Sequence, residues 1–190
     1  NTGSIYALKL LGGNPNEITQ SGREKLYDYY YNKFRLGQAT GIELNEAEGF
    51  IPDPNDGWGR DSVYANMTFG QNLGITMLQT ATAFSAVVNG GTYHTPTIIK
   101  GTLENGELVK RPQAGNIEDK ILSDETSATM RDMLINNRKY KIAQGIDRQG
   151  YDIGGDFEFS NAVNNTLIKR FVLSVQSTEI PECPPHGNSP

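Results

Sequence analysis

The residues that could do covalent chemistry do not form a complete active site at any spacing in the sequence. No serine has a lysine three residues later, and Ser21 comes nearest, with Lys25 four residues on. The chain also has no Gly-x-Ser-x-Gly turn, no phosphate-binding loop and no His-Glu-x-x-His pair. A serine hydroxyl is a poor nucleophile until a neighbouring base takes its proton. The residues alone therefore predict no complete nucleophilic site.

The composition gives little support to metal, nucleic-acid or membrane-spanning functions. The chain has one cysteine, Cys183, and two histidines, His94 and His186, which stand far apart and show no metal-ligand spacing. The net charge is -5 and no basic block occurs, which argues against a nucleic-acid partner. No run approaches the ~18 apolar residues of a membrane span. We therefore expect no metal, no cofactor and no nucleic acid among the partners.

The elements that would position a site are organised around an apolar stretch flanked by glycines, residues 69–91. Thr76 is expected to cap a helix there, with Gln79 three residues later closing a capping box. Asn89-Gly90-Gly91 is expected to end this helix, because glycine adopts the left-handed conformation at little cost. The apolar periodicity predicts a buried face made of Leu78, Ala81, Phe84 and Val88, with Met77 and Val87 alongside.

Two helices are expected before this stretch. Thr2–Leu11 has a helical apolar pattern and is followed by two glycines. A capping box at Ser21–Glu24 predicts a second helix that ends near Leu36. Its tyrosines could stack on sugars or bases, but the spacing favours a core stripe of Leu26, Tyr30 and Phe34 instead. After this helix, residues 41–59 are expected to be irregular, and their acidic side chains (Glu43, Glu46, Glu48, Asp53 and Asp56) to be solvated.

The second half of the chain is expected to contain more strands. Asn105-Gly106 predicts a type I′ hairpin turn. A helix opening at Ser123–Glu125 is expected to end near Asn136-Asn137, with Met130, Met133 and Leu134 turned inward. Leu167-Ile168 and Phe171–Val175 are interpreted as a pair of strands.

Several short motifs follow one another along the first 155 residues. They are Phe34–Gly37, Thr40–Ile42, the stretch 69–79 and Asn89–Gly91, followed by Pro96 and by Ile121–Leu134. In this order they resemble the transpeptidase domain of class B penicillin-binding proteins. The resemblance implies an α/β (α+β) fold of the β-lactamase/transpeptidase type, incomplete in this chain, in which a helical subdomain packs on a mainly antiparallel sheet.

The resemblance also implies a reaction, D,D-transpeptidation during peptidoglycan cross-linking. In that family the serine of a Ser-x-x-Lys motif is acylated by a stem peptide, and β-lactams trap the same serine. The implied partners are peptidoglycan stem peptides, β-lactams and other cell-wall synthesis proteins, with no cofactor. The implied location is the extracytoplasmic face of the bacterial inner membrane, where a single-pass anchor outside this chain would hold the parent protein.

The chain departs from the family at its site motifs. Asn1 would end the family's Ser-x-Asn motif, although a first residue without a role is equally compatible with the sequence. Asp156-Phe157-Glu158 stand where the resemblance places Lys-Thr-Gly, directly after Gly154-Gly155. A carboxylate at Asp156 would reverse the charge that should meet the substrate's carboxylate, a change of several kcal/mol at ~4 Å and an effective dielectric of about 20.

These observations predict a chain that is part of a larger protein. Residues 1–155 would be a partial transpeptidase domain, 156–180 a strand-rich segment of unassigned relation to the family, and 181–190 a disordered tail. On this hypothesis the 190 residues alone are inactive, because nucleophile and base are missing. The alternative is a non-catalytic pseudo-transpeptidase or an interaction module of the cell envelope, which the acidic residue at Asp156 favours.

Overall fold

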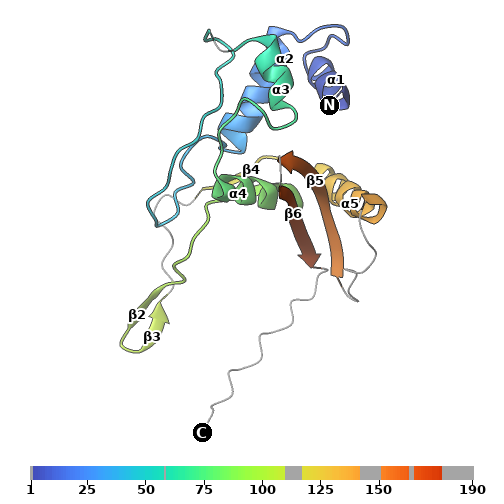
Figure 1. Cartoon of the computed structure of the whole chain (residues 1–190). Helices are drawn as coiled ribbons and strands as arrows, with labels where there is room; N and C mark the ends of the chain where they lie inside the picture. The colour runs from blue at the N-terminus through green and yellow to red at the C-terminus, as the bar shows by residue number, and fades with distance from the viewer. Residues whose placement is uncertain (1, 58, 110–116, 142–150, 163–164, 177–190) are drawn as a thin grey trace. The chain divides into compact units, whose positions relative to one another are not determined.

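The computed structural model describes residues 2–57, 59–109, 117–141, 151–162 and 165–176. The chain divides into two compact units, Asn1–Asp124 and Glu125–Pro190, which are described separately. The first unit contains most of the helices and two small sheets, and the second contains a long helix and a hairpin (Figure 1). Asn1, Trp58 and the predicted tail 181–190 lie outside the described residues.

The core of the first unit forms where four helical segments meet. These are α1 (Thr2–Leu11), α2 (Gln20–Tyr27), the π-helix η1 (Asp28–Lys33) and α3 (Asp61–Met67), and α3 was not predicted. The buried cluster consists of Leu8, Ile51, Tyr64 and Met67. The Tyr64 hydroxyl donates to the Pro52 carbonyl at 2.7 Å, so this buried polar group is satisfied.

The second predicted helix is correct in place but wrong at both ends. Thr19, not Ser21, is its N-cap, because the Thr19 hydroxyl accepts from the Gly22 amide at 3.2 Å. The helix changes from α to π at Asp28, ends at Lys33 and is followed by Arg35 at a φ of 55°. Leu26 and Tyr30 pack against the core as predicted.

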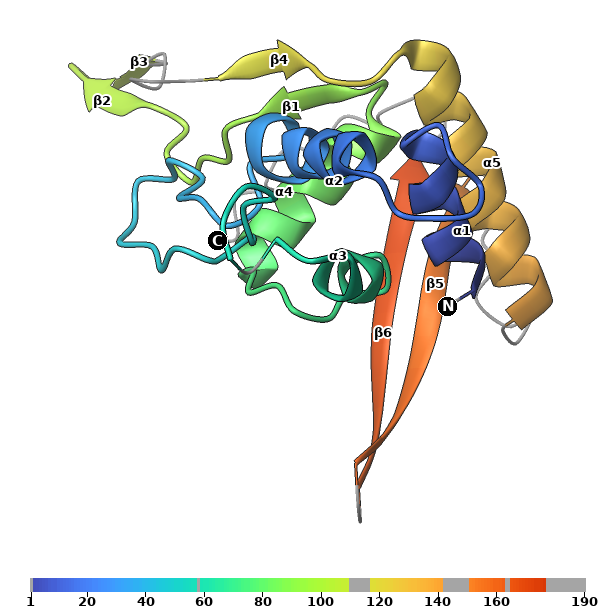
Figure 2. The same ribbon diagram turned by 90° about the horizontal axis from the view of Figure 1, so that it is seen from above.

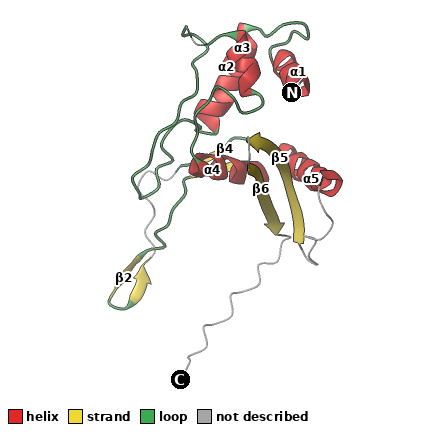
Figure 3. Cartoon of the chain, in the orientation of Figure 1, coloured by secondary structure: helices red, strands yellow, loops and turns green. Residues whose placement is uncertain are grey.

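A long irregular segment connects η1 to α3, as the sequence predicted for residues 41–59. Figure 3 shows it as loop, and its one described bridge pairs Phe50 with Gly74. The Phe50 amide donates to the Gly74 carbonyl, and the Gly74 amide donates to the Phe50 carbonyl at 2.9 Å. Regular structure therefore does not organise this segment, and side chains must do so.

The central helix α4 (Met77–Val88) confirms its predicted ends but not its predicted face. The Thr76–Gln79 capping box is present, and Gly90 and Gly91 are left-handed, at φ values of 100° and 94°. The buried side chains are Gln79, Thr82, Ala83 and Ala86. Met77 is 80% exposed and Ala81 is exposed, which contradicts the prediction. Polar Gln79 and Thr82 can be buried because each is hydrogen-bonded.

Two short antiparallel sheets complete the first unit. Strand β1 (Thr92–His94) pairs with β4 (Glu118–Lys120), and β2 (Thr102–Glu104) pairs with β3 (Glu107–Val109). Asn105 and Gly106 have φ values of 52° and 86°, which confirms the predicted type I′ turn.

The second unit consists of α5 (Asp124–Lys141) and an antiparallel hairpin of β5 (Tyr151–Ala162) and β6 (Asn165–Gln176). Figure 2 shows α5 running beside β5, and the Asn137 side chain donates to the Gly155 carbonyl at 3.2 Å. A Cβ on Gly154 would lie 3.0 Å from the Leu134 Cβ, so glycine permits this close approach.

Three predictions for this unit are wrong. Met130 and Met133 were expected to face inward, but both are exposed, and the buried residues among the described side chains of α5 are Ser127 and Arg138. The helix also continues past Asn137 to Lys141. Leu167-Ile168 and Phe171–Val175 do not pair with each other, because both lie on β6 and the partner strand is β5. Among the helices of the described residues, none is long and apolar enough to cross a membrane.

We predict that Gly91→Ala destabilises the first unit much more than Gly70→Ala. Both glycines are left-handed, but a Cβ on Gly91 would lie 2.3 Å from the Leu122 carbonyl oxygen, whereas Gly70 faces open space. Backbone strain alone costs about 1 kcal/mol, and overpacking raises the expected loss at Gly91 to at least about 3 kcal/mol. Urea unfolding followed by far-UV circular dichroism measures both, and equal losses would contradict the close approach.

Candidate functional site

The Gln79 side chain joins three separate segments of the first unit. Its Oε1 accepts from the amides of Gly37 at 3.1 Å and Thr76 at 3.2 Å, and its Nε2 donates to the Gln38 carbonyl at 2.7 Å. Gln79 is 1% exposed, so these bonds form away from water. A neutral amide can accept through its oxygen and donate through its nitrogen at the same time, as this arrangement requires. The sequence predicted the bond to Thr76 but not the two bonds to the loop.

A carboxylate closes the turn that follows this loop. Glu46 Oε2 accepts from the Thr40 amide at 2.9 Å and hydroxyl at 2.6 Å, while Oε1 accepts from the Gly41 amide at 2.8 Å. Burial alone would raise the pKa of Glu46, but these hydrogen bonds outweigh it and lower the pKa below its ordinary value of 4.5. Glu46 is therefore ionised at neutral pH and serves as a fixed anion for the backbone.

A second carboxylate ties the same segment to the chain beyond β1. Glu43 accepts from the Thr97 hydroxyl and from the Ile98 amide, the latter at 3.1 Å. The hydrogen bond from Thr97 lowers the pKa of Glu43. Glu43 is exposed, in agreement with the predicted solvated run, whereas Glu46 is partly buried and its carboxylate binds backbone and hydroxyl groups.

The phenol groups of three tyrosines in the first unit stay neutral at neutral pH, because their pKa values are raised. Burial raises the pKa of Tyr93, the nearby Arg35 guanidinium lowers it, and Glu46 raises it, with a net increase. Tyr93 is 1% exposed. Burial likewise raises the pKa of Tyr64 and Tyr30. None of these phenols is suited to act as a general base at neutral pH.

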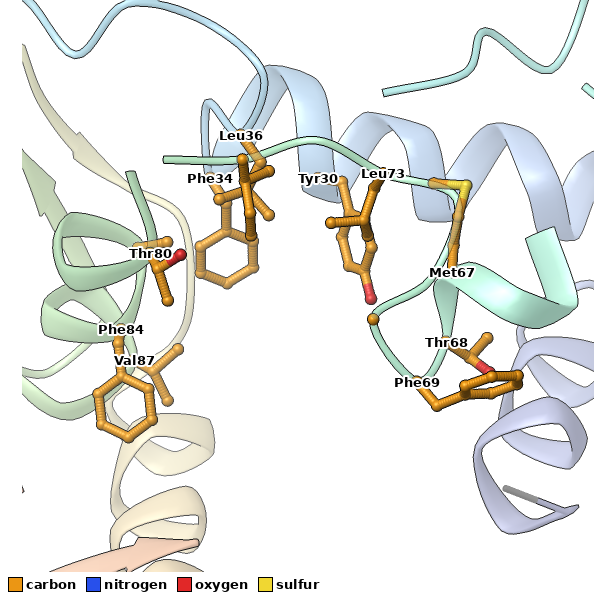
Figure 4. Close-up of a pocket in the computed structure, with 13 residues that line it drawn as sticks. Tyr30, Phe34, Leu36, Met67, Thr68, Phe69, Leu73, Thr80, Phe84 and Val87 are labelled. Atoms are coloured by element: carbon orange, nitrogen blue, oxygen red, sulfur yellow. The ribbon is translucent and has the colours of Figure 1, made fainter. Parts of the chain in front are cut away.

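An apolar groove of about 340 Å³ lies in the same unit. Figure 4 shows Phe34, Thr80 and Phe84 along one wall and Tyr30, Met67 and Phe69 along the other. The Thr80 hydroxyl donates to the Thr76 carbonyl at 3.0 Å, and the Thr68 hydroxyl donates to the Ala65 carbonyl at 2.7 Å. The Thr68 and Thr80 hydroxyls are thus engaged and most of the other lining residues are apolar, so the groove suits apolar packing.

Three rings of the tyrosine-rich helix, those of Tyr27, Tyr29 and Tyr31, each have a partner against one face. Tyr27 and Tyr31 stack on each other with ring centroids 5.1 Å apart. The Lys33 ammonium lies 3.9 Å from the centre of the Tyr29 ring. These contacts use one face of each ring, on which a sugar could otherwise stack.

The predicted site residues are placed only in part. Asn1 lies outside the described residues, so its role stays a prediction. The backbone of Asp156-Phe157-Glu158 forms the middle of β5, paired with Phe171, Arg170 and Lys169 of β6. That these residues occupy the family's Lys-Thr-Gly position stays a prediction.

A known protein family matches the chain. The sequence profile described as "Penicillin binding protein transpeptidase domain" matches residues 15–155, which is most of the chain. The chain belongs to this family. The resemblance to class B penicillin-binding proteins is thereby confirmed, and the match ends at Gly155, directly before Asp156-Phe157-Glu158.

Relatives of this transpeptidase-domain chain are much longer than it is. It is 38% identical over 115 residues to penicillin-binding protein PbpB of Mycobacterium tuberculosis, covering 60% of this chain and 16% of the relative. It is 35% identical over 140 residues to stage V sporulation protein D of Bacillus subtilis, covering 70% and 21%. The chain thus spans about a fifth of the curated relatives it matches.

A solved structure confirms the predicted fold class. Penicillin-binding protein 3 of Mycobacterium tuberculosis, solved in complex with aztreonam, matches with a TM-score of 0.59 and 24% identity. The match covers 90% of this chain and 42% of that one. The penicillin-binding transpeptidase fold, α+β with antiparallel sheets, is therefore that of this chain.

We predict that Gln79→Ala lowers the free energy of unfolding by about 2–4 kcal/mol, because it removes three hydrogen bonds and leaves buried backbone groups unpaired. The matched control is Gln71→Ala, at an exposed position, with an expected change within about 0.5 kcal/mol. Urea unfolding measures both variants. If Gln79→Ala lowers the free energy of unfolding as little as Gln71→Ala does, the hydrogen bonds of the Gln79 side chain do not stabilise the fold.

We predict that Glu46 makes the stability of the first unit depend on pH. Its pKa is lowered in the folded state, so its contribution is complete above the ordinary value of 4.5 and is lost as pH falls through the folded pKa. Glu46→Gln should therefore be less stable than the unaltered chain at pH 7, by about 1 kcal/mol for this partly exposed group.

The difference between the two proteins should shrink below about pH 4.5, where the carboxylate becomes protonated. Glu48→Gln is the control, because Glu48 is exposed and accepts no hydrogen bond from the described residues. Thermal unfolding across this pH range measures the effect. A difference that stays constant with pH would contradict the role of the ionised carboxylate.

Proposed function

We propose that this chain serves a peptidoglycan D,D-transpeptidase as the structural frame of its transpeptidase domain. The observation that carries the proposal is the family match over residues 15–155, together with the hydrogen bonds by which the buried Gln79 side chain joins α4 to the preceding loop. In this proposal residues 1–155 belong to the transpeptidase domain, stem peptides are the substrates and β-lactams the inhibitors. Aztreonam bound to the related penicillin-binding protein 3 supports the β-lactam part.

The roles of the frame and of the chemistry are assigned to different residues. α4 and the loop held by Gln79, Glu46 and Glu43 position neighbouring elements, and Asn1 would supply the amide of a Ser-x-Asn motif. The nucleophile of the reaction would be a serine activated by a lysine three residues later. The proposed location is the extracytoplasmic face of the inner membrane, which the resemblance to class B penicillin-binding proteins supports.

A second candidate is a non-catalytic pseudo-transpeptidase or interaction module of the cell envelope. Asp156 favours it, because an acidic residue in the middle of β5 repels a substrate carboxylate where the family uses a cation. A gene sequence that encodes Ser-x-x-Lys ahead of Asn1 supports the enzyme. Its absence from the whole gene supports the interaction module.

We predict that the 190-residue chain forms no covalent adduct with a fluorescent penicillin, because none of its serines has a lysine three residues later. Denaturing gel electrophoresis after incubation reads out the label. A label that survives denaturation would contradict this prediction.

The full-length protein encoded by the gene that contains these residues is tested in the same assay, beside the 190-residue chain. A covalent label on that protein, prevented by excess unlabelled β-lactam, is expected for a transpeptidase. Failure of a correctly folded protein to react would reject the enzyme and leave the interaction module.

A further inference from the structure

Two Asn-Gly pairs in the first unit differ in how the fold holds the asparagine. They are Asn89-Gly90, at the end of α4, and Asn105-Gly106, at the tip of the β2–β3 hairpin. In an Asn-Gly pair the glycine backbone nitrogen can attack the asparagine side-chain amide, because glycine has no side chain to block the approach. The reaction requires the side chain and backbone of the asparagine to rotate together. Local structure therefore decides which pair reacts.

Hydrogen bonds fix the side chain of Asn89. Its Oδ1 accepts from the amides of Gly91 at 3.1 Å and Thr92 at 3.0 Å, and its Nδ2 donates to the Thr92 carbonyl at 2.7 Å. The Asn89 amide also donates to the Ser85 carbonyl as the C-cap of α4. Rotation of this side chain into the attacking geometry breaks all three side-chain bonds and disturbs the helix end.

Asn105 has no such restraint. It is exposed, and no described residue forms a hydrogen bond with its side chain. A Cβ on Gly106 would have nothing within 4 Å, so the glycine nitrogen lies at an open surface. The attacking rotation at Asn105 therefore breaks no side-chain contact.

The hairpin that carries Asn105 is also poorly supported. Its strands have three residues each, and the cross-strand pair Leu103 and Leu108 is 76% and 46% exposed. A two-stranded hairpin without a packed face is marginally stable in water. Its tip opens at low free energy, which releases the turn dihedral angles that the reaction must change.

We propose that Asn105 is a site of spontaneous deamidation, selected over Asn89 by the fold. The Gly106 nitrogen bonds to the Asn105 side-chain carbon, the bond from that carbon to Nδ2 breaks, and ammonia leaves with the amide proton. Water then opens the resulting succinimide at either carbonyl, giving aspartate or isoaspartate. The chemistry needs only water as co-reactant and involves no oxidation or reduction.

The product alters the hairpin in two ways. It places a new carboxylate between Glu104 and Glu107, which are already paired across the strands. The isoaspartate form also lengthens the turn backbone by one carbon, which a two-residue type I′ turn does not accommodate. Deamidation at Asn105 therefore unravels the β2–β3 hairpin and leaves α4 intact.

Peptide mapping of the intact chain tests the proposal. Trypsin releases residues 101–110 as one peptide, in which Asn105 is the only residue with an amide side chain. Asn89 lies in a different tryptic peptide, so the two sites are measured separately. After incubation in mildly alkaline buffer, mass spectrometry should show Asn105 converting at least about tenfold faster than Asn89, a ratio that the loss of one or two ordinary hydrogen bonds would produce. In denaturant the two rates should converge.

Similar native rates, or a faster reaction at Asn89, would overturn the proposal. Two products of equal mass at Asn105, aspartate and isoaspartate, are expected from the succinimide, whereas direct hydrolysis gives aspartate alone. Gly106→Ala is the matched variant, since its methyl group hinders the attacking nitrogen while its strained φ of 86° weakens the turn. Slower deamidation in this variant supports succinimide formation, and an unchanged or faster rate contradicts it.

Discussion

The fold of the first unit depends on one buried amide, the side chain of Gln79. It supplies an acceptor to Gly37 and Thr76 and a donor to Gln38, so a loop, a helix entry and the helix itself meet at one group. A carboxylate could not donate to the Gln38 carbonyl, and an apolar side chain would leave buried backbone groups unpaired. The packing around it is close, because a Cβ on Gly49 would lie 3.1 Å from Gln79 Oε1.

The long segment between η1 and α3 shows how an irregular chain becomes ordered without strands or helices. Its backbone groups need partners, as all buried ones do. Gln79 satisfies those at Gly37 and Gln38, and Glu46 satisfies those at Thr40 and Gly41. The segment is thus organised by hydrogen bonds between side chains and backbone groups, made mainly by the Gln79 amide and the Glu46 carboxylate.

The sequence predicted features that depend on neighbouring residues and missed those that depend on distant ones. The Thr76–Gln79 box, the stop at Gly90-Gly91 and the turn at Asn105-Gly106 are local, because the partner lies within three or four residues. The buried face of α4 is not local. The apolar periodicity predicts that Ala81 is buried and Gln79 is not. It contains no information on the hydrogen bonds that Gln79 makes with residues 41 and 42 positions away, and these bonds allow its burial.

The same limit applies to the other helices and to the candidate site. Ser21 was predicted as the cap of the second helix, but Thr19 caps it, because the Thr19 hydroxyl accepts from the Gly22 amide. The exposed positions of Met130 and Met133 follow from which face of α5 meets its neighbours. Motif order also led to the prediction that Asp156–Glu158 occupy the Lys-Thr-Gly position, and this stays a prediction.

If Asp156–Glu158 occupy the position of the family's Lys-Thr-Gly, the fold and the chemistry of a transpeptidase can be separated there. The β5–β6 register passes from Gly155 opposite Val172 to Asp156 opposite Phe171 without a break. Strand pairing uses backbone groups, so it places no demand on the charge of residue 156. Substrate binding does place such a demand, because a cation and a carboxylate act oppositely on the same anion. The pairing of β5 with β6 is therefore compatible with either charge at residue 156, whatever that position contributes to a substrate site.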